Sequence, residues 1–185
     1  MISKINESLT ENEIIGVLIP AATRDEMLMR IAEDLSSNYN NYNKILYIST
    51  DKSCNELIGK FEENKINTDK FYFIDCITRT ANRNVTSSKR CRFISSPGAK
   101  DEIQTGVFDI LAKEEIDAVL FDSPFSLLKY YEHTDILQFM HLLTLKLVVE
   151  GCKGILTFQK ESTDSLRKSI EMFVDKTIDM ESDNM

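Results

Sequence analysis

The chain has 185 residues, 42% of them hydrophobic and 28% charged, with a formal net charge of −8 and a pI near 4.9. This length and apolar content are typical of one folded domain and exclude a disordered chain. The acidic balance argues against a generic nucleic-acid-binding protein, because lysine and arginine supply most non-specific affinity for phosphates. We therefore expect a single domain over residues 1–185.

The sequence carries no targeting or metal-binding signal. No apolar stretch reaches the roughly 20 residues of a membrane span, so we expect a cytoplasmic protein. His133 and His141 have a spacing that does not suit two ligands of one metal. The cysteines show no C-x-x-C pair, which predicts buried, reduced thiols. They are Cys54, Cys76, Cys91 and Cys152.

Short apolar runs alternate with amphipathic segments along the chain. Residues 1–12 have no hydrophobic periodicity and are predicted to be a lead-in, with a short helix around Lys4–Leu9. Apolar runs too short for a helix are typical of strands buried on both faces of a parallel sheet. The predicted strands are Ile14–Ile19, Lys44–Ser49, Phe71–Cys76, Cys91–Ser95, Asp117–Phe121, Gly154–Phe158 and an edge strand within Met172–Ile178.

Apolar residues at helical spacing predict a helix after most strands. Ser53 and Glu56 have the spacing of a capping box, which marks a helix start. The segment Asp135–Glu150 is apolar on nearly every side, so we expect this helix in the core or in an interface. The predicted helices are Asp25–Ser37, Ser53–Asn64, Lys100–Lys113, Asp135–Glu150 and Asp164–Glu171.

This alternation predicts right-handed βαβ units, and therefore an α/β three-layer sandwich with a mostly parallel central sheet. Ligands of such sheets bind outside the carboxyl ends of the strands. Residues 77–92 follow neither period and are predicted as a loop, and residues 179–185 as a frayed tail.

Four segments together resemble RecA/KaiC-like ATPases of archaeal type, in the same order and at similar spacing. They are KILYISTDKSCNELIGKFEENKINTDKFYF, FISSPGAKDEIQTGV, IDAVLFDSPFSLLKYYE and VEGCKGILTFQKES. The resemblance extends over about residues 14–178 and implies a RecA-like core. Ring and filament assembly in that family also makes self-association plausible by analogy.

The resemblance implies three candidate nucleotide-site residues. Asp122 matches the Walker B aspartate, which holds magnesium because this cation prefers oxygen ligands. Asp51 matches the position of a glutamate base but is one methylene shorter. Gln159 lies near the place of a polar sensor for the terminal phosphate. Each residue also has a structural interpretation: Asp122 as a helix cap, Asp51 as a turn residue and Gln159 as a solvated side chain.

The phosphate loop of that family is missing. A working loop reads G-x-x-x-x-G-K-S/T, whereas this chain has Pro-Ala-Ala-Thr-Arg-Asp-Glu at residues 20–26, with neither glycine nor lysine. Thr23 and Glu26 have capping-box spacing, and the carboxylates of Asp25 and Glu26 in the first helical turn would repel a phosphate. Arg24 is in principle a substitute for the lysine, although a lone arginine in a surface turn is more often solvated. We expect no ATP hydrolysis.

A basic stretch stands out from this acidic chain. No acidic residue occurs from Cys76 through Ala99. This segregation predicts an interaction loop, with protein contact preferred over nucleic acid because no aromatic residue is available between Thr78 and Arg92 to stack on bases. The basic residues are Arg79, Arg83, Lys89, Arg90 and Arg92.

Taken together, these features favour a non-catalytic RecA/KaiC-like regulatory or scaffolding domain that acts through protein–protein contact or self-association, without a cofactor or membrane contact. One alternative is an ATP-binding protein, with magnesium, that has a non-standard phosphate site. A second alternative is a DNA-associated recombinase paralogue.

Overall fold

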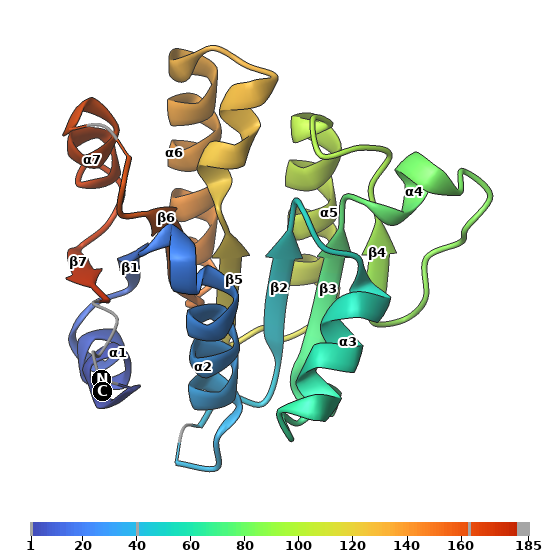
Figure 1. Ribbon diagram of the computed structural model, residues 1–185, viewed down its shortest axis with the longest axis horizontal. Coiled ribbons are helices and arrows are strands. Elements are labelled where there is room, and N and C mark those ends of the chain that lie inside the picture. Colours follow the sequence, from blue (N-terminus) through green and yellow to red (C-terminus); the bar gives the residue numbers. More distant parts are fainter. Residues whose placement is uncertain (1, 40, 163, 181–185) are drawn as a thin grey trace.

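The computed structural model describes residues 2–39, 41–162 and 164–180. Its centre is a sheet of seven strands in the order β4-β3-β2-β5-β6-β1-β7 (Figure 1). All strand pairs are parallel, which confirms the predicted fold class. The strands are β1 (Ile14–Ile19), β2 (Ile45–Ser49), β3 (Phe71–Asp75), β4 (Cys91–Phe93), β5 (Ala118–Asp122), β6 (Lys153–Gln159) and β7 (Lys176–Asp179).

Helices connect these strands and cover both faces of the sheet. The α-helices are α1 (Ile2–Glu11), α2 (Arg24–Ser36), α3 (Cys54–Glu63), α4 (Thr78–Ala81), α5 (Lys100–Lys113), α6 (His133–Val149) and α7 (Asp164–Ile170). Short 3-10 turns are η1 (Ala21–Thr23), η2 (Thr68–Lys70) and η3 (Pro124–Lys129).

Each face of the sheet has its own apolar core, because successive residues of a strand point to opposite faces. Phe71 and Phe73 of β3 belong to the core under α1, α2 and α3. Tyr72 and Ile74 of the same strand belong to the core under α5 and α6. Figure 1 shows α2 and α3 on one side of the sheet and α5 and α6 on the other. Strands buried on both sides explain the nearly continuous apolar runs in the sequence.

Three predictions about irregular segments need correction. The short helix predicted around Lys4–Leu9 is present but longer than predicted: α1 has ten residues, because Ile5 and Leu9 lie one turn apart and are both buried against α2 and β1. The predicted loop at residues 77–92 contains the short helix α4. Asp75 stabilises the start of this helix, because its carboxylate accepts hydrogen bonds from the backbone N–H groups of Ile77 and Thr78. The predicted tail begins inside β7, and only residues 181–185 of it lie outside the described part of the chain.

The strand order determines which loops meet. β6 lies between β1 and β5, and β5 pairs with β2 on its other side. The carboxyl ends of these four strands therefore meet at one edge of the sheet, the carboxyl edge, where Arg24, Asp51, Asp122 and Gln159 follow or end them. No helix within the described residues is both long and apolar enough to cross a membrane.

Candidate functional site at the carboxyl edge

Arg24 joins two of the predicted site residues. It is the first residue of α2, and its guanidinium group donates hydrogen bonds to Asp51 Oδ2 at 2.6 Å and to Asp122 Oδ1 at 2.7 Å. The Arg24 side chain is only 19% exposed. The interpretation of Arg24 as a solvated surface residue is therefore wrong, because α2 begins directly above the ends of β2 and β5.

Asp122 is the most buried carboxylate of this group. It ends β5 with 0% exposure, and Tyr47 donates its hydroxyl proton to Asp122 Oδ2 at 3.3 Å. Burial raises the pKa of Asp122 to about 6, although the charge of Arg24 opposes this rise. For Arg24 itself, burial lowers the pKa, but Asp51 and Asp122 together raise it above its ordinary value. Arg24 thus neutralises a buried carboxylate that forms no other ion pair with the residues that the structure describes.

Further charged residues lie next to Arg24, Asp51 and Asp122. Lys52, with a side chain only 9% exposed, donates to Asp25 Oδ1 at 2.8 Å and lies 3.7 Å from Asp51 Oδ2. Lys60 of α3 donates to Asp25 Oδ2 at 2.9 Å and lies 3.4 Å from Glu56. The hydrogen bond from Lys52 is the main reason why the pKa of Asp25 is lowered to about 2.

These residues form one connected group, which we call the charge network. It contains three cations and four carboxylates, so its formal charge is one negative unit. The members are Arg24, Asp25, Asp51, Lys52, Glu56, Lys60 and Asp122. Every cation of the network already has a carboxylate partner, which leaves no excess positive charge for a phosphate.

The predicted capping box at the start of α2 is wrong. Thr23 makes no side-chain cap hydrogen bond, and its Oγ1 is buried without a partner among the described residues. Thr23 belongs to the 3-10 turn η1, in which its N–H donates to Pro20 O, and its φ of −116° and ψ of 13° are not the extended backbone that a capping residue usually has. Glu26 instead accepts from Arg30 at 2.7 Å. In α3, by contrast, Ser53 Oγ accepts from the Glu56 N–H as the sequence predicts.

A carboxylate from the turn after β6 binds one backbone N–H group of the connection between β1 and α2. The Ala21 N–H donates to both carboxylate oxygens of Glu161, each at 3.1 Å. A phosphate loop uses backbone N–H groups in such a turn to hold its anion. Here an acidic side chain of the same chain accepts from one of them.

A small cavity of about 260 Å³ adjoins the charge network. Arg24, Asp51 and Gln159 line it together with hydroxyl groups from several loops. One of these is Ser123, which has a positive φ of 60°, a conformation that costs free energy in residues other than glycine. The structure therefore brings Arg24, Asp51, Asp122 and Gln159 to one place. Thr23 lies beside Arg24, and its side-chain oxygen has no hydrogen-bond partner among the described residues.

Three important residues of this edge escaped the sequence analysis: Tyr47, Lys52 and Asp75. Asp75 ends β3 with 1% exposure and accepts hydrogen bonds from the N–H groups of Cys54, Ile77 and Thr78 and from the Thr78 hydroxyl. A signal for Lys52 and Asp75 was present, since both lie at the carboxyl end of a predicted strand. Tyr47 lies inside β2, where periodicity predicts only a core side chain.

The basic loop is partly neutralised by the chain itself. Arg90 pairs with Asp69 at 2.7 Å and Arg92 with Asp109 at 3.0 Å. Arg79 donates to the Val85 carbonyl oxygen. The remaining two residues, Arg83 and Lys89, form no ion pair within the described parts of the chain. The predicted interaction loop therefore presents fewer free charges than its sequence suggests.

The cysteines and histidines offer no alternative centre. All four cysteines are buried and free, as predicted, and burial raises the pKa of the Cys152 thiol to about 11. The ring of His133 hydrogen-bonds Ser169 at 3.0 Å, and His141 lies beside Phe173. Across residues 2–39, 41–162 and 164–180, no three His, Cys, Asp or Glu side chains are grouped to hold a metal ion.

The arrangement of strands and helices matches solved structures. The structure is similar to that of a KaiC-like protein from the hyperthermophilic archaeon Pyrococcus horikoshii, with a TM-score of 0.64 and 12% identity over 94% of this chain and 74% of that chain. The chain has a RecA/KaiC-like fold. The flagellar accessory protein FlaH from Methanocaldococcus jannaschii is also similar, with a TM-score of 0.54 and 17% identity over 91% of this chain and 70% of that chain. No protein-family model and no curated protein matches the sequence.

Proposed function

We propose that this chain is a RecA/KaiC-like domain without ATPase activity, which acts as a regulatory or scaffolding component through protein–protein contact. The observation that carries the proposal is the position of Arg24. Its guanidinium group occupies the space between Asp51 and Asp122, the two carboxylates that the resemblance assigns to catalysis and magnesium.

The residues at this edge do not fit a magnesium–nucleotide complex. Asp122 is fully buried and already paired with Arg24, so a cation would have to displace the guanidinium group to reach it. The connection between β1 and α2 contains no glycine, and a carboxylate, Glu161, lies on its Ala21 N–H. A triphosphate would meet this carboxylate and a charge network with one negative unit in excess, and both would repel it.

Calorimetric titration of the full chain with ATP and magnesium tests the proposal. We expect no saturable heat, and no release of phosphate above the rate in buffer alone. Saturable binding, or hydrolysis that is lost in Asp122→Asn, would contradict it. Asp109→Asn is the matched control, because Asp109 is a partly exposed aspartate paired with Arg92 outside the site.

One observation favours a second function, an ATP-binding protein with a non-standard phosphate site. The buried Thr23 Oγ1 has no hydrogen-bond partner among the described residues and adjoins Arg24 at the start of α2. An oxygen of a bound phosphate could accept its proton. If this second function holds, titration of the unchanged chain with ATP and magnesium gives binding heat, and Thr23→Val removes it. Under the leading proposal, neither the unchanged chain nor Thr23→Val gives binding heat.

A further inference from the structure

The outer face of α6 carries large apolar side chains that the chain leaves uncovered. Its inner face, including Phe139 and Leu143, is buried in the core under the sheet. At about 100° per residue, the exposed apolar residues fall together on the opposite face of the helix. They are Leu142 at 47% exposure, Leu145 at 52%, Val148 at 46% and Val149 at 72%. We call these four residues the α6 patch.

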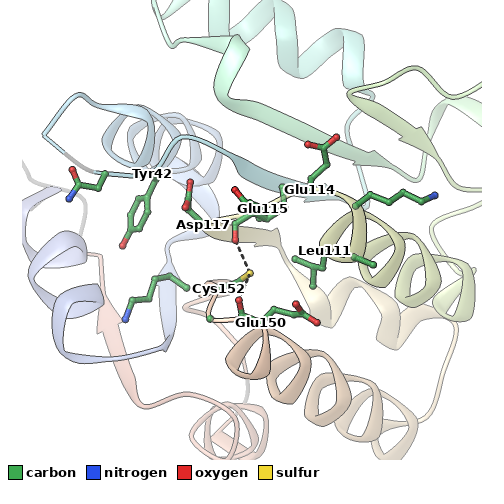
Figure 2. Close-up of a pocket in the computed structure, with 13 residues that line it drawn as sticks. Tyr42, Leu111, Glu114, Glu115, Asp117, Glu150 and Cys152 are labelled. Atoms are coloured by element: carbon green, nitrogen blue, oxygen red, sulfur yellow. Dashed lines mark hydrogen bonds between the residues drawn. The ribbon is translucent and has the colours of Figure 1, made fainter.

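An acidic cavity begins where the α6 patch ends. Glu150, which follows Val149 directly, lines a cavity of about 770 Å³ at the amino edge of the sheet. Figure 2 shows Glu150 and Cys152 on one side of this cavity and Tyr42, Asp117 and Glu115 on the other. The charged residues that line it are Lys113, Glu114, Glu115, Asp117, Glu150 and Lys153, four carboxylates and two lysines.

Some carboxylates of this cavity are paired with a cation and others are not. Glu114 pairs with Lys44 at 2.7 Å, and Glu150 pairs with Lys146 of its own helix at 2.5 Å. Among the described residues, Asp117 accepts hydrogen bonds from two backbone N–H groups, those of Asn43 and Lys44, and forms no ion pair. Glu115 forms neither a hydrogen bond nor an ion pair with any residue that the structure describes. Of the two lysines that line the cavity, Lys153 pairs with Glu13 at 3.1 Å, and Lys113 forms no ion pair with any residue that the structure describes. The two unpaired carboxylates outnumber this one unpaired lysine, so a negative charge remains in excess beside the apolar helix face.

A second copy of this chain fits that surface poorly. Each copy carries a net charge of −8, so two copies repel each other. A stable dimer buries about 800 Å² on each partner, and four half-exposed side chains supply far less than that. An apolar strip beside unneutralised carboxylates is instead complementary to a helix with one apolar and one basic face.

We propose that the α6 patch and the acidic cavity beside it bind a basic amphipathic helix of a partner protein. Apolar side chains of the partner cover Leu145 and Val149, and its lysine or arginine residues reach Asp117 and Glu115. This inference rests on the proposed function, since it names the chemistry of the protein partner that the function requires.

The test measures the fluorescence anisotropy of a labelled helical peptide of about 18 leucine and lysine residues in amphipathic order, added to the full chain. A scrambled peptide of equal composition is the control for charge alone. We expect saturable binding of the ordered peptide only, weakened by salt because exposed charges are screened. Leu145→Glu and Val149→Glu should each weaken binding at least about tenfold. Tyr39→Glu, at a side chain that is 99% exposed elsewhere, should leave binding unchanged.

The acidic part of the surface is tested separately. Glu115→Lys should weaken binding about threefold to tenfold and reduce its dependence on salt, because one favourable charge becomes unfavourable. Glu62→Lys, on α3 across the sheet, is the matched control. Circular dichroism confirms that each variant is folded.

Three results of the peptide titrations would each overturn the inference. They are equal binding of the ordered and scrambled peptides, absence of binding at low salt, and unchanged binding by both Leu145→Glu and Val149→Glu. A dimer in sedimentation that Leu145→Glu dissociates would assign the face to a second copy and also overturn it. If the peptide does not bind and ATP does not bind either, the non-catalytic proposal still stands. ATP hydrolysis contradicts that proposal whether or not the peptide binds.

Discussion

Arg24 Nη2 lies 2.7 Å from Asp122 Oδ1, although β6 separates the strand that precedes Arg24 from the strand that Asp122 ends. The arginine side chain reaches across the end of the intervening strand. This contact links the first strand–helix unit of the chain to the middle of the sheet, and it places a positive charge on a carboxylate that water does not reach.

Replacing this arginine should destabilise the fold. In Arg24→Met the buried Asp122 carboxylate loses its cation. Removing one partner of a fully buried ion pair lowers the free energy of unfolding by roughly 3–5 kcal/mol. Because Arg24 keeps some contact with solvent, we expect a loss of about 2–4 kcal/mol here. Urea unfolding followed by circular dichroism measures the loss.

Arg30→Met is the matched control for that variant. Arg30 lies in the same helix but pairs with the exposed Glu26 at spacing i,i+4, so the expected loss is about 0.5 kcal/mol or less. Combining Arg24→Met with Asp122→Asn should recover part of the stability, because no charge then remains buried. If Arg24→Met and Arg30→Met lowered the free energy of unfolding equally, the buried ion pair would contribute no more to stability than the exposed one, contrary to this prediction.

Stability should fall as pH rises from about 4 to about 6. Burial raises the pKa of Asp122 from its ordinary value of 3.8 to about 6. Across this window the folded chain therefore binds more protons than the unfolded chain, and raising the pH favours unfolding. Asp34, whose pKa burial also raises to about 6, acts in the same direction. Urea unfolding at several pH values measures the slope.

Two substitutions separate these contributions. Asp122→Asn and Asp34→Asn should each flatten the slope between pH 4 and pH 6, and together they should nearly abolish it. Asp25 has a lowered pKa of about 2, so its stabilising contribution is present above its ordinary value of 3.8 and is lost only as pH falls toward 2. A slope that both asparagine variants leave unchanged would be inconsistent with the raised pKa values.

Asp75→Asn should destabilise the carboxyl edge at the end of β3. The substitution replaces one carboxylate oxygen by an NH₂ group, which then faces the donors that Asp75 now binds, the Cys54 N–H and the Thr78 hydroxyl among them. Leaving buried donors unpaired should cost about 2–3 kcal/mol in thermal or urea unfolding. Asp69→Asn, at an exposed aspartate paired with Arg90, should cost less than about 1 kcal/mol. A loss in Asp75→Asn no larger than that control would contradict its role.

Two glycine substitutions should have opposite signs. An added Cβ at Gly154 in β6 meets Ile14 Cδ1 at 2.6 Å and Leu147 Cδ1 at 3.1 Å, so Gly154→Ala should destabilise by about 1–2 kcal/mol through overpacking. Gly59 in α3 has no neighbouring atom within 4 Å of an added Cβ, so Gly59→Ala should stabilise by about 0.5–1 kcal/mol. Stability changes of the same sign in urea unfolding would refute this account of the packing.

Much of the fold was predictable because its strands are buried on both faces. β1 was predicted with its observed bounds, Ile14–Ile19, and α5 with its observed bounds, Lys100–Lys113. α1 was missed as a full helix because only Ile5 and Leu9 pack inward, too few to reveal a period. α4 was missed because a buried carboxylate, Asp75, rather than an apolar face, organises it.

The site was predictable in position but not in its contacts. Residues at strand ends meet because parallel strands end at one edge, which brought Asp51, Asp122 and Gln159 together with Arg24. Local spacing suggested that the Thr23 side chain caps α2, but Thr23 ends the 3-10 turn η1 and its side chain makes no cap hydrogen bond. The ion pair of Arg24 depends on residues 27 and 98 positions away, and no local pattern encodes such a separation.

The position of β1 has a consequence for synthesis on the ribosome. Its two neighbours in the sheet, β6 and β7, both belong to the last quarter of the chain, from Lys153 onward. β1 is therefore translated well before the strands that flank it, and it has no strand to pair with until the residues from Lys153 onward have emerged. A nascent chain arrested before Lys153 leaves an apolar strand with two open edges, a species that aggregates readily or recruits a chaperone.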